Sequence, residues 1–190
     1  MDMLIVGMLL FLGAHSVSIV APQWRDGVAS RLGEWPWKAM YAIVSLAGFL
    51  LLIRGYADAR QAAVVLYDPP TWMRSLAALI MLPVFPLLLA AYLPGRIKTA
   101  AKHPMLVATK AWAVAHLLAN GTLPDVILFG GLLAWAVADR ISLKRRTPRP
   151  IPGAPPSSLN DVLAVVLGLG IYGAFVMYLH VRWFGVSPLG

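Results

Sequence analysis

Long apolar runs separated by short polar segments follow one another along the whole chain. A helix needs about 20 apolar residues to cross the hydrocarbon core of a bilayer. Six stretches approach this length, namely residues 3–21, 38–53, 72–93, 104–119, 122–138 and 158–183. We therefore predict an all-α fold, a polytopic membrane helix bundle with six transmembrane helices. If the short and comparatively polar stretch 104–119 lies at the interface instead, the bundle has five.

Local signals mark where several of these helices begin and end. Pro22 closes the first stretch, and Pro94-Gly95 follows the third. Thr122-Leu-Pro-Asp125 has the spacing of a capping box, with proline near the first helical position. The proline-rich segment 147–157 is predicted to be a solvated linker on the cytoplasmic side, within one domain that spans residues 1–190.

Composition agrees with a chain that is solvated mostly by lipid. Of its 190 residues, 59% are hydrophobic and 13% are charged, whereas a soluble domain carries about 25% charged residues. Too few polar side chains remain to cover a water-soluble globule. The chain has no cysteine, which excludes a disulfide scaffold, an iron–sulfur cluster, a cysteine-ligated zinc site and a cysteine nucleophile.

The net charge of +8 is distributed unevenly between the loops. Most basic residues lie in the first, third and fifth loops: Arg25, Arg31, Lys38, Arg96, Lys98, Lys102, Arg140, Lys144, Arg145, Arg146 and Arg149. The positive-inside rule places these loops in the cytoplasm and both termini on the other side. No basic face interleaved with aromatic residues is present, so nucleic acid is not an expected partner. The first stretch has Asp2 and no basic residue at its amino end, so we expect it to be retained, not cleaved as a signal peptide.

Two histidines are expected at the same depth inside the membrane. His15 lies 12 residues after Met3, and His116 lies 12 residues after Pro104. At 1.5 Å per residue each is about 18 Å from the side at which its helix enters. Because the two helices enter from opposite sides of a core about 30 Å thick, the imidazoles lie within about 6 Å of one level.

Such a pair is the arrangement that axially ligates a b-type haem iron. Two alternatives remain open. Each histidine could make a polar contact between helices, as the neighbouring Ser16 and Ser18 would allow for His15, at about 0.6 kcal/mol on average. The histidines could also belong to a proton relay. A zinc site is poorly supported because no carboxylate lies nearby.

Other candidate residues lie around the second histidine. Lys110 shares a helical face with His103, about 120° from His116. One alternative is that Lys110 snorkels to the cytoplasmic interface. The other is that Lys110, His103 or Lys102 pairs with an anionic group at the cytoplasmic rim, such as a haem propionate or a lipid phosphate. Trp112 lies one turn before His116 on the same face and could line a cofactor pocket. His180, beside Arg182 and Trp183, is expected to be an interfacial anchor.

The run of residues 102–121, KHPMLVATKAWAVAHLLANG, resembles the central signature of the NnrU family of membrane proteins. The likeness continues through residues 128–131 and 135–146, and Gly13-Ala-His-Ser16 extends it to the first stretch. It covers essentially the whole chain. The family is related to the 15-cis-ζ-carotene isomerases, integral membrane proteins that bind haem b.

This resemblance implies that His15 and His116 are the axial ligands, the same two residues that the depth argument selects. It also implies that His103 lies at the rim of the cofactor site. The isomerases carry a cysteine three residues before the second ligand, and Ala113 occupies that position here. A cysteine-based ligand exchange is therefore excluded.

The resemblance implies a haem b protein with a role in nitric-oxide or nitrite metabolism, that is, in denitrification, by redox chemistry, sensing or reductase maturation. An alternative is a haem-dependent cis–trans isomerase of a carotenoid-like polyene. A second alternative is a non-haem membrane transporter or assembly factor. The expected location is the bacterial inner membrane, with both termini periplasmic. The expected partners are membrane lipid and either a lipophilic polyene or a denitrification reductase. No catalytic residue and no oligomeric state follow from the sequence.

Overall fold

Helices account for all the regular structure in the part of the chain that the computed structural model describes, residues 1–147, 149 and 151–189, apart from one isolated bridge between Val65 and Thr122. The predicted all-α class is confirmed. The chain forms two compact units, each built from two segments. Unit 1 comprises Met1–Tyr67 and Thr122–Thr147, and unit 2 comprises Asp68–Gly121 and Pro148–Gly190. The expected single domain stays a prediction.

Unit 1 begins with three consecutive helices and ends with a long one. The first three are α1 (Asp2–Val20), α2 (Pro22–Leu32) and α3 (Glu34–Ala59), followed by a 3-10 turn, Arg60–Ala62. The second segment is helical from α8 (Leu123–Asp125) through a π-helical turn (Val126–Gly130) to α9 (Gly131–Ser142). Two predicted boundaries were wrong here. Residues 22–32, expected as a loop, form α2, and α3 continues past Ile53, where the i,i+4 pair of Arg54 with Asp58 keeps both charges on the exposed surface.

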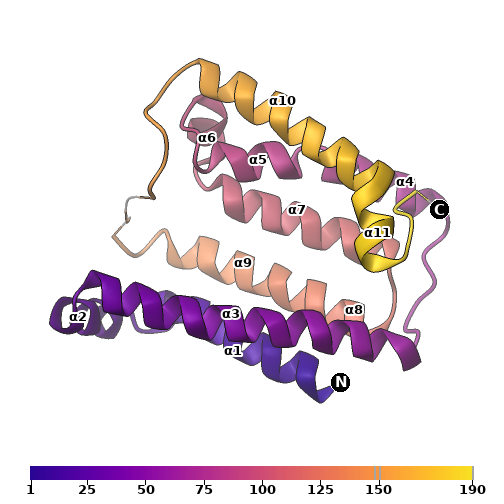
Figure 1. The fold of residues 1–190 in the computed structure, drawn as a ribbon, viewed down its shortest axis with the longest axis horizontal. Coiled ribbons are helices and arrows are strands. Elements are labelled where there is room, and N and C mark those ends of the chain that lie inside the picture. The colour runs from indigo at the N-terminus through magenta and orange to yellow at the C-terminus, as the bar shows by residue number, and fades with distance from the viewer. Residues whose placement is uncertain (148, 150, 190) are drawn as a thin grey trace. The chain divides into compact units, whose positions relative to one another are not determined.

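Glycine residues bring α1 and α3 into close contact, side by side in Figure 1. A Cβ atom at Gly7 would lie 2.7 Å from the Leu52 Cα, and one at Gly48 would lie 3.0 Å from the Phe11 Cα. A Cβ atom at Gly55 would lie 2.7 Å from the Leu4 Cα. Along this contact the residue numbers rise in α1 while they fall in α3, so the two helices are antiparallel. Their register is set by positions that only glycine fits.

The buried carboxylate of Asp125 connects the end of α3 with the start of α8 in unit 1. Asp125, 3% exposed, accepts hydrogen bonds from the Thr122 backbone N–H at 2.9 Å and from the Thr122 hydroxyl at 2.5 Å, and the predicted capping box is confirmed. Its second oxygen accepts a 2.5 Å bond from the Tyr56 hydroxyl at the end of α3. The pKa of the Tyr67 hydroxyl is raised mainly by burial and, to a smaller extent, by the negative charge of Asp125. Asp125 therefore joins the end of α3 to the start of α8.

Unit 2 contains α4 (Trp72–Met81), α5 (Val84–Ala90), α6 (Arg96–Ala101), α7 (Pro104–Ala119), and α10 (Leu159–Ala174), which continues through a π turn (Phe175–Leu179) into α11 (His180–Phe184). Pro83 separates α4 from α5. The bounds of α7 are those predicted from the sequence. Gly168 places α10 against Pro86 of α5, where a Cβ atom would lie 2.7 Å from the Pro86 Cα. Figure 1 shows α10 running along α5.

Two residues at the start of α10 hold the turn before α6. The carboxylate of Asp161 accepts hydrogen bonds from the Arg96 N–H at 2.8 Å and the Ile97 N–H at 3.0 Å, so it caps α6 from a distant helix. Asn160 donates to the Pro94 carbonyl at 2.8 Å. In the linker 147–157, Ala154 donates its N–H to the Tyr92 carbonyl at 2.9 Å. The end of the linker is thus attached to this turn.

Within the described part of the chain, four helices are long and apolar enough to cross a membrane: Asp2–Val20, Glu34–Ala62, Trp72–Ala90 and Leu159–Phe184. Pro104–Ala119 is a shorter apolar helix of 16 residues. At 1.5 Å per residue it spans about 24 Å, less than the hydrocarbon core. The helical segment from Leu123 to Ser142 contains Asp125, Asp139 and Arg140 and is not among the four. Neither the six-span nor the five-span prediction is confirmed.

The glycine contacts predict that Gly55→Ala lowers the free energy of unfolding by about 1–3 kcal/mol, because the new methyl group forces the backbones of α1 and α3 apart. Gly13→Ala on α1 is the matched control, because nothing lies within 4 Å of a Cβ atom at that position. It should stay within about 1 kcal/mol of the wild type. Thermal unfolding in detergent, followed by tryptophan fluorescence, measures both variants. Equal losses would contradict the proposed register.

The buried clamp predicts that Asp125→Asn destabilises the protein by about 1–3 kcal/mol, because an amide NH2 then faces a hydrogen-bond donor. Asp58→Asn removes a carboxylate from the exposed pair with Arg54 and should cost less than about 1 kcal/mol. The same unfolding assay compares the two. If Asp58→Asn is the more damaging, the Asp125 clamp is not a main contributor to the stability of unit 1.

Candidate functional site

His15 lies on α1 in unit 1, and its ring is held by its own helix. The Nδ1 atom donates a 2.7 Å hydrogen bond to the carbonyl of Phe11, one turn earlier. The Phe11 ring lies against the imidazole, with centroids 4.3 Å apart and planes inclined by 36°. Because a carbonyl only accepts hydrogen bonds, Nδ1 carries a proton, and in the neutral imidazole Nε2 then carries the lone pair.

Two aromatic side chains from other helices complete the surroundings of His15. The Tyr41 ring of α3 lies 5.2 Å from the imidazole, and the Trp135 ring of α9 meets it edge-on at 5.8 Å. The Trp135 indole N–H is buried and has no hydrogen-bond partner among residues 1–147, 149 and 151–189. Buried donors are normally paired, so this indole N–H favours a further molecule beside His15.

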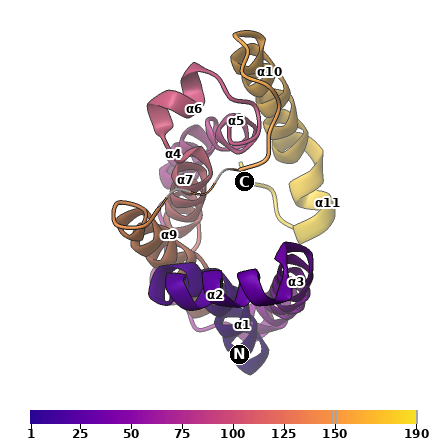
Figure 2. The ribbon, with the colours of Figure 1, turned by 90° about the vertical axis from the view of Figure 1, so that its left-hand side faces the viewer.

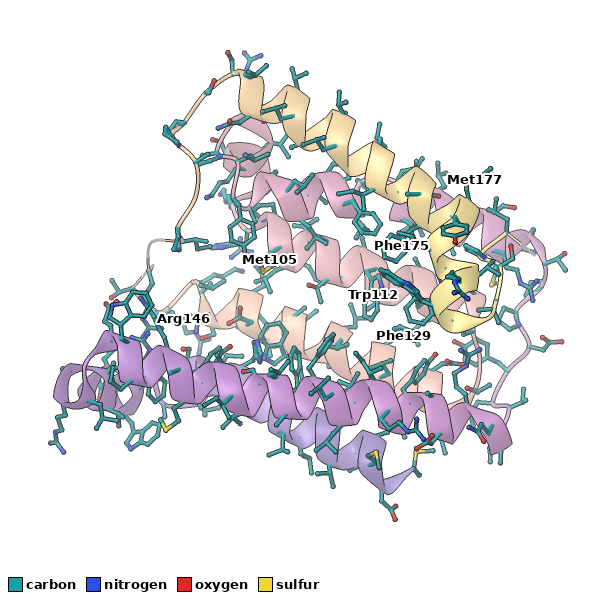
Figure 3. The ribbon with its side chains drawn as sticks, viewed as in Figure 1. Met105, Trp112, Phe129, Arg146, Phe175 and Met177 are labelled. Carbon is teal, nitrogen blue, oxygen red and sulfur yellow. The ribbon has the colours of Figure 1, made fainter. Side chains whose placement is uncertain are left out.

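His116 lies on α7 in unit 2 and is held in the same way. Its Nδ1 atom donates a 2.8 Å hydrogen bond to the carbonyl of Trp112, again one turn earlier. The Trp112 ring, labelled in Figure 3, lies 4.8 Å from the imidazole at an angle of 45°. Trp112 thus lies beside His116, and its expected role in lining a cofactor pocket stays a prediction. Ala113 and Ala115 of the same helix are buried, at 0% and 1% exposed.

Each unit thus presents one histidine with the same local arrangement. An aromatic residue precedes the histidine by four positions, accepts its Nδ1 proton through the backbone and lies against its ring. Such a hydrogen bond selects the tautomer, orients the ring and makes Nε2 a better ligand. His180 differs, because its Nδ1 atom donates forward to the Val186 carbonyl, beyond the end of α11.

The remaining predicted residues lie along α7. His103 is the N-cap residue of this helix, and its carbonyl accepts hydrogen bonds from the Leu106 and Val107 N–H groups, both at 3.1 Å. Lys102, just before it, has a φ of 59°, which turns the chain from α6 into α7. Lys110 is half-buried on α7. The proposed roles of His103 and Lys110 at the rim of a cofactor site stay predictions.

Tyr41 and Trp135 are the residues near His15 that the sequence did not single out. The i−4 aromatic residue could have been found from the sequence, because Phe11 and Trp112 occupy equivalent positions before the two histidines. Tyr41 and Trp135 could not have been found from the sequence, because they belong to other helices than His15. No group of three or more histidine, cysteine, aspartate or glutamate residues within the described ranges is arranged to hold a metal ion.

Comparison with known proteins gives one finding. The family described as NnrU protein matches residues 3–188. No curated protein and no solved structure matches the chain.

The two hydrogen bonds predict that His15 and His116 are Nδ1–H tautomers, whereas free histidine in water prefers the Nε2–H form. Nitrogen NMR of protein labelled at the histidine rings, recorded at a pH where they are neutral, reports the tautomer. His15→Gln and His116→Gln assign the two signals by their disappearance. An Nε2–H form at either position would contradict the arrangement described above.

Proposed function

Because the chain belongs to the NnrU family, we propose that it is an integral membrane haem b protein with His15 and His116 as the axial ligands of the iron. The observation that carries this proposal is the common presentation of the two histidines, each with Nδ1 bonded to the carbonyl one turn earlier. Iron–imidazole ligation usually requires this kind of second bond, which leaves Nε2 as the ligand atom.

The residues around the histidines suit such a cofactor. Phe11, Tyr41 and Trp135 surround His15 with aromatic surface, which packs well against a flat apolar macrocycle. On α7, Trp112 provides the corresponding surface beside His116. The buried N–H of Trp135 has no hydrogen-bond partner in the described part of the chain, and a bound group or its ordered water would supply an acceptor.

Haem with two histidine ligands supplies one-electron redox chemistry. The task of this chain is then to hold the two imidazoles in fixed orientations and to exclude bulk water with aromatic side chains. On the strength of the family resemblance, we place the role in nitric-oxide or nitrite metabolism, by electron transfer, gas sensing or reductase maturation. We place the protein in the bacterial inner membrane, with both termini in the periplasm.

The isomerase alternative has no structural observation in its favour. The related ζ-carotene isomerases carry a cysteine at the position of Ala113, and this alanine is fully buried on α7. A thiolate cannot replace a histidine ligand here, because the chain has no cysteine. A substrate would therefore reach the iron only through simple loss of a histidine ligand.

The proposal predicts that protein purified in detergent from haem-replete cells shows a Soret band, with sharp α and β bands after reduction. His15→Ala and His116→Ala should each lose the low-spin spectrum and most of the bound haem. His180→Ala is the matched control and should keep the wild-type spectrum, because His180 donates its Nδ1 proton to Val186 outside the two aromatic arrangements.

A colourless wild-type protein would overturn the proposed function. Loss of the spectrum in His180→Ala, with retention in His116→Ala, would overturn the ligand assignment. The reduced protein is then incubated with a cis-polyene. Conversion of the polyene to its trans isomer would favour the isomerase over the role in nitrogen-oxide metabolism.

A further inference from the structure

A groove of about 280 Å³ lies at one end of unit 1, away from the Asp125 clamp. Its apolar side is formed by Ile19 at the end of α1, Pro22 at the start of α2, and Ala138 and Ile141 of α9. Its polar side is formed by Ser142, Arg145 and Arg146. The groove therefore has the two-sided character of a site for an amphiphile with an anionic head and an apolar body.

The two arginines have different electrostatic environments. Arg146, labelled in Figure 3 beyond the C-terminal end of α9, forms an ion pair with Asp139 in which the side chains are 14% and 12% exposed. This pair fixes the Arg146 guanidinium at the groove. Arg145 is exposed and forms no ion pair among residues 1–147, 149 and 151–189. The groove thus retains the positive charge of Arg145, which an anion would balance.

The position of the groove along α1 favours a lipid as the source of that anion. Asp2–Val20 is one of the four candidate spans, and Ile19 lies in its last turn. The apolar side of the groove therefore lies where a transmembrane α1 leaves the hydrocarbon core, and the arginines lie where the lipid phosphates begin.

Aromatic and basic residues of the neighbouring α2 and α3 support the placement of the groove at the surface of the membrane. Figure 2 looks onto this end of unit 1, with α2 in front of α1. Trp24 and Trp35 are 58% and 83% exposed, as expected of tryptophans in the interfacial layer of a bilayer. The Arg25 guanidinium lies 5.6 Å from the centroid of a Trp37 ring, and the Lys38 ammonium lies 5.7 Å from that of Trp35.

We propose that this groove binds the head group of an anionic phospholipid, with its phosphate on Arg145 and Arg146 and its first acyl methylenes on Ile19, Ala138 and Ile141. The negative charge of the glycerophosphate pairs with the positive charge of Arg145. The apolar side of the groove accommodates the acyl chain of the lipid. This site does not depend on haem binding.

The test uses full-length protein purified in mild detergent and incubated with mixed micelles of either phosphatidylglycerol or phosphatidylcholine with identical acyl chains. Native mass spectrometry then counts the lipid that each chain retains. Wild-type protein should retain phosphatidylglycerol in preference to phosphatidylcholine. Arg145→Gln should weaken phosphatidylglycerol retention by about fivefold, the effect of removing one basic residue near an anionic membrane surface.

Two further variants separate the groove from general attraction. Arg140→Gln removes the same charge from the last turn of α9, outside the groove, and should retain phosphatidylglycerol like the wild type. Ala138→Leu fills the apolar side without changing charge and should lower retention. Near-wild-type thermal unfolding of each variant confirms that it is folded.

Equal losses in Arg140→Gln and Arg145→Gln would overturn the proposal in favour of nonspecific attraction. Unchanged retention in Ala138→Leu would also overturn it. Excess inorganic phosphate, which lacks acyl chains, should leave phosphatidylglycerol bound. Displacement by phosphate would show that the groove is a site for free anions and not for lipid.

Discussion

Close approach of α1 and α3 at three glycines determines how unit 1 presents His15. Within lipid there is no hydrophobic force between helices, so association depends on packing and on a few polar contacts. Gly7, Gly48 and Gly55 let the two backbones meet, and each admits no Cβ atom without displacement of the partner helix. The register that follows brings Tyr41 of α3 to the imidazole of His15. The histidine environment is thus a consequence of backbone packing elsewhere along the same pair of helices.

The two histidines have the same local environment. Each is anchored at Nδ1 by the carbonyl four residues earlier, and each has an aromatic ring against it. An unpaired imidazole N–H inside a membrane is costly, so the helix itself supplies the acceptor. The same bond that satisfies the donor also leaves Nε2 as the basic nitrogen. One interaction therefore satisfies the buried donor and leaves the nitrogen that the proposed iron ligation needs.

Carboxylates close the units where helices end. Asp125 accepts hydrogen bonds from two elements of unit 1, and Asp161 caps α6 in unit 2 from the first turn of α10. Both use a charge to satisfy backbone N–H groups that a helix start leaves without partners.

The arginine-rich end of unit 1 differs, because Arg146 is paired whereas Arg145 has no ion pair in the described part of the chain. This imbalance is the basis of the proposed lipid site.

Local properties of the sequence determined the all-α class, the bounds of α7, the Thr122–Asp125 box and the choice of His15 and His116, because run length, capping and residue spacing act within a few residues. Helix α2 was missed because its polar residues and its leading proline are typical of a loop. Tertiary structure alone decided that Tyr41 and Trp135 surround His15, and that Asp161 caps a helix 65 residues away. These contacts depend on which glycines face which helix. The packing of whole helices determines this, and a local sequence pattern does not encode it.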